Sequence, residues 1–161
     1  MIDELEEMLK TAVGGVCQTM LNFDPRPIPL QKNAITSDAH LASSVGFIGK
    51  VTGVVYIYAT ADFARDITRT MTGLSDAEID SDEIMVNDAM GEVANMVVGN
   101  LKATLVDRGM ACVLTIPSIV RGSNFSIEAI SSTTRRVLCF RCKDSHNLVV
   151  EILIKPEEPT E

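Results

Sequence analysis

The sequence predicts an α+β domain in which a mainly antiparallel β-sheet packs, as one of two layers, against long α-helices. Short β-branched and apolar runs come in hairpin-like pairs, and two longer segments have the apolar spacing of helices. The chain lacks the regular strand and helix alternation that produces a parallel sheet. Its 161 residues, 46% hydrophobic and 22% charged, are expected to form one domain over residues 1–155 and a solvated tail at 156–161.

Three segments are predicted to be helices. Glu4–Leu21 places apolar residues at helical spacing and crowds acidic residues into its first turn, where the helix dipole favours them. A shorter helix is expected over Ala61–Thr72, because Gly73 supplies a stop. The third runs from Ser81 toward Val106 and is apolar around most of its circumference, which indicates extensive burial. Residues 76–82 are expected to form an acidic link.

Five apolar runs are predicted to be strands. Prolines 25, 27 and 29 break the first helix, and a polar, irregular stretch is expected to continue to about Ala42. The first two strands form a hairpin, in which glycines 46, 49 and 53 indicate bulges or a close approach of backbones. The predicted strands are Val45–Gly49, Gly53–Tyr58, Cys112–Val120, Arg136–Cys142 and Asn147–Ile154.

The charge balance argues against nucleic-acid and membrane partners. Fourteen Lys and Arg residues stand against 22 Asp and Glu, for a formal charge of -8, which repels phosphate backbones and anionic membrane surfaces. The acidic, amphipathic N-terminal segment is unlike a signal or transit peptide, and no apolar run reaches the length of a membrane span. We therefore expect a cytoplasmic protein whose four cysteines are reduced.

The third predicted helix contains residues that a purely structural helix seldom uses. Gly91 and Gly99 each lower the stability of a helix by about 1 kcal/mol relative to alanine. The side chain of Asn95 competes with the helix backbone for hydrogen bonds. Asp88, Glu92 and Asn95 are spaced i, i+4 and i+7 and so lie on one stripe, which Gly99 continues one turn later. Such local inconsistency is typical of functional sites, although the solvated side of an amphipathic helix has the same spacing.

A longer pattern favours the functional interpretation. Asp88-x3-Glu92-x2-Asn95 is followed after 21 residues by Pro117. In this pattern, and in the stretch GEVANMVVGNLKATL that begins at Gly91, the chain resembles the CheX/CheC/FliY group of chemotaxis phosphatases, with the CheX branch most similar. The resemblance extends over nearly the whole chain and implies a CheC-like version of the α+β fold.

The resemblance implies a phosphatase that hydrolyses the aspartyl phosphate of a phosphorylated CheY-type response regulator. Glu92 and Asn95 would be the catalytic residues: Glu92 would dock the receiver by pairing with one of its lysines, and Asn95 would position the attacking water. No cofactor of its own is expected, because the phosphorylated partner supplies Mg2+, and a homodimer joined through sheet edges is implied. The supporting or partner-binding positions would be Asp88, Gly91, Gly99 and Pro117.

Members of this group are often internally duplicated, and the first predicted helix contains part of the same pattern. There Asp3-x3-Glu7-x2 leads to Lys10 instead of asparagine, and Pro29 departs by three residues from the expected spacing. The water-positioning amide is therefore missing from this helix. We expect a single active site, as in the CheX branch.

Two other interpretations start from the same sequence. Cys139 and Cys142, with His146 beyond them, suggest a metal or redox site, but zinc binding would require a second pair, and within a continuous strand these two cysteines would point to opposite faces. No metal site is therefore expected. Cys17 and Cys112 are expected in the core, and His40 and His146 on the surface. The other alternative is a module that binds a receiver without hydrolysing anything, and an intact motif does not exclude it.

Overall fold

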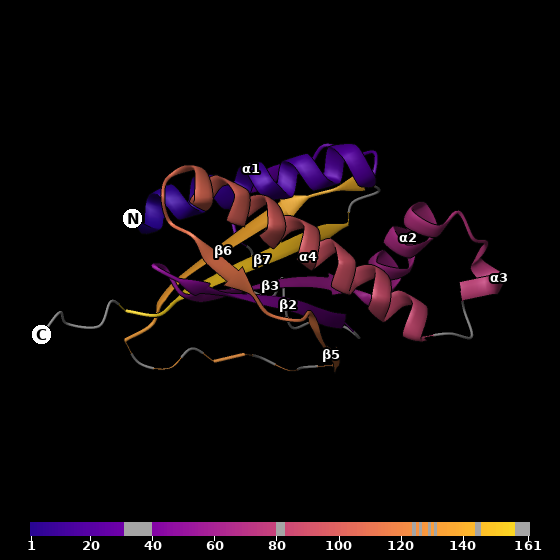
Figure 1. The fold of residues 1–161 in the computed structure, drawn as a ribbon. Helices are drawn as coiled ribbons and strands as arrows, with labels where there is room; N and C mark the ends of the chain where they lie inside the picture. The colour runs from indigo at the N-terminus through magenta and orange to yellow at the C-terminus, as the bar shows by residue number, and fades with distance from the viewer. Residues whose placement is uncertain are drawn as a thin grey trace, which may run out of the picture.

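The computed structural model describes residues 1–30, 40–79, 83–123, 125, 127–128, 130, 132–143 and 146–156. The described strands form one antiparallel sheet in the order β1-β6-β7-β3-β2-β4, and β5 pairs with β2 along the same edge as β4. Helices α1 and α4 lie side by side over one face of this sheet (Figure 1). The predicted α+β fold with a mainly antiparallel sheet is therefore confirmed.

The three predicted helices are present with nearly the predicted limits. The hydroxyl of Thr60 accepts a hydrogen bond from the backbone N–H of Phe63 at 3.2 Å and so caps the first turn of α2. Gly73 ends this helix with a φ of 71°, a conformation that favours glycine. The three predicted helices are α1 (Ile2–Met20), α2 (Ala61–Thr72) and α4 (Glu83–Asp107), and a short additional helix, α3 (Asp76–Ile79), lies between the last two.

The predicted hairpin joins the neighbouring strands β2 and β3. A Cβ atom built on Gly53 would lie 2.4 Å from the carbonyl oxygen of Leu153, and one built on Gly49 would lie 2.2 Å from that of Ala111. The expected close approach of backbones at these glycines is thus confirmed. The strands are β1 (Arg26–Ile28), β2 (His40–Gly49), β3 (Gly53–Thr60), β4 (Cys112–Leu114), β5 (Ser118–Gly122), β6 (Thr134–Arg141) and β7 (Asn147–Ile154).

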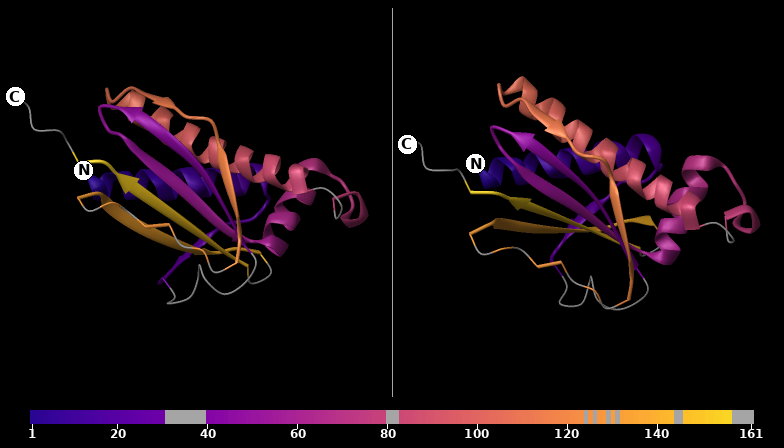
Figure 2. Two further views of the ribbon diagram at one scale, coloured as in Figure 1. Left: turned by 90° about the horizontal axis from the view of Figure 1, so that it is seen from below. Right: turned by 60° about the horizontal axis from the view of Figure 1, so that its bottom comes forward.

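The main core lies between the sheet and the helices, and a smaller apolar cluster lies on the opposite face of the sheet. In Figure 2, the described residues of the segment between β5 and β6 run along this second face. Phe125 and Ile127 of that segment pack against the second cluster. The main core includes Leu5, Leu9, Phe47, Ile57, Val97, Leu101 and Ile152, and the second cluster comprises Ala42, Tyr58, Cys139 and Val149.

The run predicted as one strand over Cys112–Val120 is instead two short strands, β4 and β5, so this prediction was wrong in detail. Pro117 has no backbone N–H to donate to the β-ladder, so the strand is interrupted around this residue. Thr115 maintains the connection to β2, because its N–H donates to the Gly46 carbonyl at 2.9 Å and its hydroxyl accepts from the Gly46 N–H at 2.8 Å. The connector Thr115–Pro117 is therefore held to the sheet at its first residue.

Three further elements differ from the prediction. The segment broken by prolines contains β1, which pairs with β6, and β2 already begins at His40. The acidic link contains α3, which buries Ile79. His40 is also buried, and its ring stacks on that of Phe125 at 4.3 Å, so the expectation of a surface histidine was wrong. Residues 31–39 and 157–161 lie outside the described part of the chain.

A candidate partner-binding site on helix α4

Helix α4 turns a polar stripe away from the core. This stripe was predicted from the spacing of Asp88, Glu92 and Asn95 in the sequence. In the structure, Asp88 and Glu92 are exposed and Asn95 is half-buried, so all three side chains reach the surface at least in part. The opposite side of the helix is buried and includes Met90, Val93 and Val97. Asn95 therefore lies on the polar side of a helix whose other side packs into the core.

The structure brings Pro117 next to the stripe, although it is distant in sequence. A Cβ atom built on Gly91 would lie 3.5 Å from the Cβ of Pro117, so the connector between β4 and β5 passes against the helix one residue before Glu92. Gly91 is buried, and a side chain larger than a methyl group would press on the proline ring. The contact explains why a glycine and a distant proline occur together in this chain.

A second contact between the same two elements was not predicted from sequence. The guanidinium Nε of Arg121 on β5 donates to the Oδ1 of Asn87, the residue before Asp88. A single arginine separated by 34 residues from its asparagine partner gives no readable pattern in one sequence, so only the fold could reveal this pair. Together with the Gly91–Pro117 contact, it fixes the sheet edge against the first half of α4.

The surface beyond Asn95 is uncluttered. A Cβ atom built on Gly99, one turn after Asn95, would have no neighbouring heavy atom within 4 Å. At the other end of the stripe, one turn before Asp88, Ile84 is exposed by 69%. The acidic and amide groups thus lie on an open helix surface with room for a macromolecule.

Helix α1 uses the residues of its partial motif differently. The Lys10 ammonium lies 3.0 Å from the Glu7 carboxylate and 3.5 Å from that of Glu6. Glu7 is therefore engaged by the lysine that replaces the amide of the motif. A single active site remains a prediction from the sequence.

The cysteine pair does not form a joint site. Cys139 belongs to the cluster on the outer face of the sheet, whereas Cys142 belongs to the main core, as predicted from strand alternation. Burial raises the pKa of the Cys142 thiol, and likewise that of Cys17, to about 12. Among the described residues, no group of three or more His, Cys, Asp or Glu side chains is placed to hold a metal ion.

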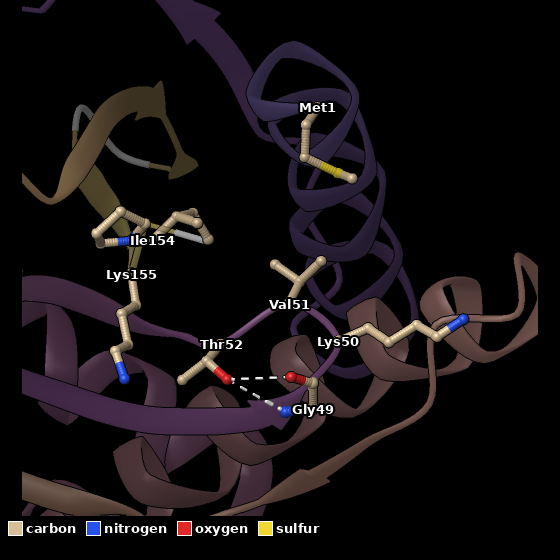
Figure 3. A pocket seen from close by; sticks show the side chains of 8 residues that line it. Met1, Gly49, Lys50, Val51, Thr52, Ile154 and Lys155 are labelled. Atoms are coloured by element: carbon tan, nitrogen blue, oxygen red, sulfur yellow. Dashed lines mark hydrogen bonds between the residues drawn. The ribbon is translucent and has the colours of Figure 1, made fainter. Parts of the chain in front are cut away.

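A pocket of about 320 Å³ at the turn between β2 and β3 offers different chemistry (Figure 3). Lys50, Thr52, Ile154 and Lys155 line it, and none of the predicted site residues does. The Thr52 hydroxyl is already hydrogen-bonded to the backbone of Gly49, at 3.3 Å from both its nitrogen and its oxygen. The pocket brings together neither an acid–base pair nor an activated nucleophile.

The fold and the helix stripe together define an α+β domain with an acidic and amide face on one long helix. The family model described as chemotaxis phosphatase CheX matches residues 41–141. This chain therefore belongs to the CheX family of chemotaxis phosphatases.

Solved structures of CheX proteins have the same fold. CheX from Desulfovibrio desulfuricans has a TM-score of 0.78 and 25% sequence identity, with 94% of this chain and 99% of that chain covered. CheX from Vibrio vulnificus has a TM-score of 0.79 at 22% identity, with the same coverage of 94% and 99%. The CheX of a CheX–CheY–BeF3–Mg2+ complex from Borrelia burgdorferi has a TM-score of 0.73 at 22% identity, over 93% of this chain and 97% of that chain.

Among curated proteins, none matches this chain significantly. In the described part of the chain, no helix combines the length and the apolar character needed to cross a membrane.

Proposed function

We propose that this protein hydrolyses the aspartyl phosphate of a phosphorylated CheY-type receiver, with Glu92 and Asn95 as its catalytic residues. The observation that supports this proposal best is the joint presentation of a carboxylate and an amide, about one turn apart, on an open helix surface. Membership of the CheX family and the Borrelia CheX–CheY complex support the choice of partner. Such a substrate also fits the cytoplasmic location expected from the sequence.

Asn95 supplies the component that an aspartyl phosphate lacks. The acyl phosphate has a good leaving group, and the receiver brings its own Mg2+, so hydrolysis requires chiefly a water held in line with phosphorus. An amide cannot act as a general base, but its carbonyl accepts a hydrogen bond from water while its NH2 group donates one to a neighbouring oxygen. Asn95 therefore orients the nucleophile without needing a shifted pKa.

Glu92 supplies docking and register. Its exposed carboxylate forms a charge-assisted hydrogen bond with a lysine of the receiver, and this bond aligns Asn95 with the phosphoryl group. Asp88 adds a second negative charge on the same stripe. This charge also attracts the part of the receiver surface that carries the lysine. Gly91 and Pro117 maintain the position of α4 against the sheet edge, and Gly99 leaves space for the receiver.

The experiment follows phosphoryl loss from phosphorylated candidate receivers with wild-type protein, Asn95→Ala and Glu92→Ala. In parallel, binding is measured to receivers activated with beryllofluoride and Mg2+. We expect the wild type to accelerate phosphoryl loss, Asn95→Ala to bind without accelerating it, and Glu92→Ala to weaken both. A wild type that binds activated receivers yet never shortens the phosphoryl lifetime would instead establish the receiver-binding module.

The homodimer implied by the family resemblance is also proposed. The described sheet has two edges, β1 and the edge formed by β4 and β5, and an exposed edge is prone to pair with another chain. Dimerisation through an edge would cover it. Light scattering should then give twice the monomer mass, whereas the monomer mass at working concentrations would refute the dimer.

A further inference from the structure

We propose that Ile116 is an apolar contact through which the protein recognises the receiver that it dephosphorylates. This inference rests on the proposed function and adds a specificity residue outside the catalytic helix. Ile116 lies in the connector between β4 and β5, and 86% of its surface is exposed, the highest value among the exposed large hydrophobic side chains of the described residues. Burial of such a side chain by a partner is favourable, because apolar surface leaves water.

The backbone around Ile116 is held on both sides. Thr115 makes two hydrogen bonds with the Gly46 backbone, and Pro117 has a fixed φ and lies against Gly91. A side chain presented from such a constrained backbone loses less conformational freedom when a partner covers it. Ile116 is thus prepared for an intermolecular contact instead of being a loosely tethered loop residue.

The connector is also adjacent to the catalytic stripe. Pro117 contacts the helix at Gly91, the residue before Glu92, and Arg121 further along the same edge is hydrogen-bonded to Asn87. A protein that covers Glu92 and Asn95 must therefore approach the connector as well. The same partner is expected to cover Ile116.

Two other exposed apolar residues of this sheet edge, Val113 and Val120, belong to the strands themselves. Val113 and Val120 stand opposite Ile48 and Ala42 in the β-ladders, and Ala42 belongs to the cluster on the outer face of the sheet. Because side chains alternate along a strand, these valines lie on the face away from the helices. The contact at Gly91 instead ties the connector that contains Ile116 to α4, which favours the receiver over a second copy of this chain as its occupant.

The test compares Ile116→Ala and Ile116→Asp with Ile130→Asp, a matched control. Ile130 is 81% exposed and lies in the segment between β5 and β6. We expect Ile116→Ala to raise the KM for phosphorylated receiver by about tenfold, with kcat unchanged, because one apolar contact is lost. Ile116→Asp should raise KM further, and Ile130→Asp should leave both parameters unchanged.

An unchanged KM for Ile116→Asp would overturn the proposal. So would a loss of affinity accompanied by a change in oligomeric mass, since Ile116 would then belong to an interface between copies. Affinity for the receiver activated with beryllofluoride and Mg2+ is measured for the same variants. This binding measurement tests the role of Ile116 even if the wild type does not accelerate phosphoryl loss. The failure of the inference and the failure of the phosphatase proposal therefore give different results.

Discussion

Asn95 and Glu92 lie in the middle of a 25-residue helix, and at position 95 alanine or leucine would stabilise the helix better than asparagine does. Neither side chain is needed by the core, since Glu92 is exposed and Asn95 is only half-buried. Their presence together on a surface stripe is best explained by a partner that needs a carboxylate and an amide. Substitution at these two positions should therefore change activity much more than stability.

At Glu92, the substitution Glu92→Gln tests charge separately from shape. Glutamine keeps an oxygen acceptor but removes the negative charge, so the charge-assisted hydrogen bond becomes an ordinary one. Since such a bond is about twice as strong as a neutral one, we expect the KM for phosphorylated receiver to rise by about tenfold. Steady-state kinetics at low ionic strength measure the change. An equal loss with Glu83→Gln, an exposed carboxylate in the first turn of the same helix, would show that only overall charge matters.

At the scale of elements, α4 and the sheet edge act together. The helix provides the stripe, and the connector between β4 and β5 fixes it through the contact of Pro117 with Gly91 and the hydrogen bond from Arg121 to Asn87. Loss of the side-chain hydrogen bond in Thr115→Val should therefore loosen the connector as well as the ladder. The geometry of the site depends on this edge as much as on the helix.

Gly99 provides a prediction in which stability and function change in opposite directions. An added Cβ meets no atom within 4 Å, so Gly99→Ala should stabilise the protein by about 1 kcal/mol through helix propensity alone. If the receiver lies on this bare surface, the same methyl group should weaken binding several-fold. Chemical denaturation and binding to activated receiver measure the two effects.

The control for this prediction is Gly14→Ala in α1, where an added Cβ also meets no atom within 4 Å. This variant should gain similar stability and leave receiver binding unchanged. Unaltered affinity in Gly99→Ala would mean that the receiver does not reach the end of the stripe beyond Asn95.

Most of the fold could be predicted because its elements have strong local patterns. The limits of α2 follow from a capping threonine and a terminal glycine, and the stripe on α4 follows from helical spacing alone. Pro117 marks the break between β4 and β5 in the sequence itself, and the prediction of one strand overlooked this signal. The short strand β1 and the burial of His40 could not be predicted, because each depends on a partner far along the chain. For the same reason, Ile116 was not recognised as a neighbour of the stripe.

For the whole molecule, the cysteines distinguish a structural role from a reactive one. All four are buried, and burial raises each thiol pKa, to about 12 for Cys17 and Cys142. At pH 8 the thiols should therefore be protonated and inaccessible, so a thiol reagent should modify the native protein slowly and all four cysteines after denaturation. Rapid modification of any thiol in the native protein would contradict the described burial.

The acidic character of the whole chain also fits a protein partner with a basic surface. A net charge of -8 accelerates encounters with such a surface, and the effect weakens as salt is added. The catalytic step itself should depend little on salt once the receiver is bound. The effects of salt on receiver affinity and on the chemical step can therefore be separated by measuring the rate with saturating receiver.

The most direct test is a single-turnover measurement of phosphoryl loss from a cognate receiver, with wild-type protein or Asn95→Ala in saturating excess. The account predicts that wild type accelerates the loss, whereas saturating Asn95→Ala leaves the receiver at its own spontaneous rate, at least about a hundredfold slower than with wild type. Circular dichroism should show the same fold for both proteins. An Asn95→Ala variant that is bound, folded and as fast as wild type would contradict the central claim that this amide positions the water.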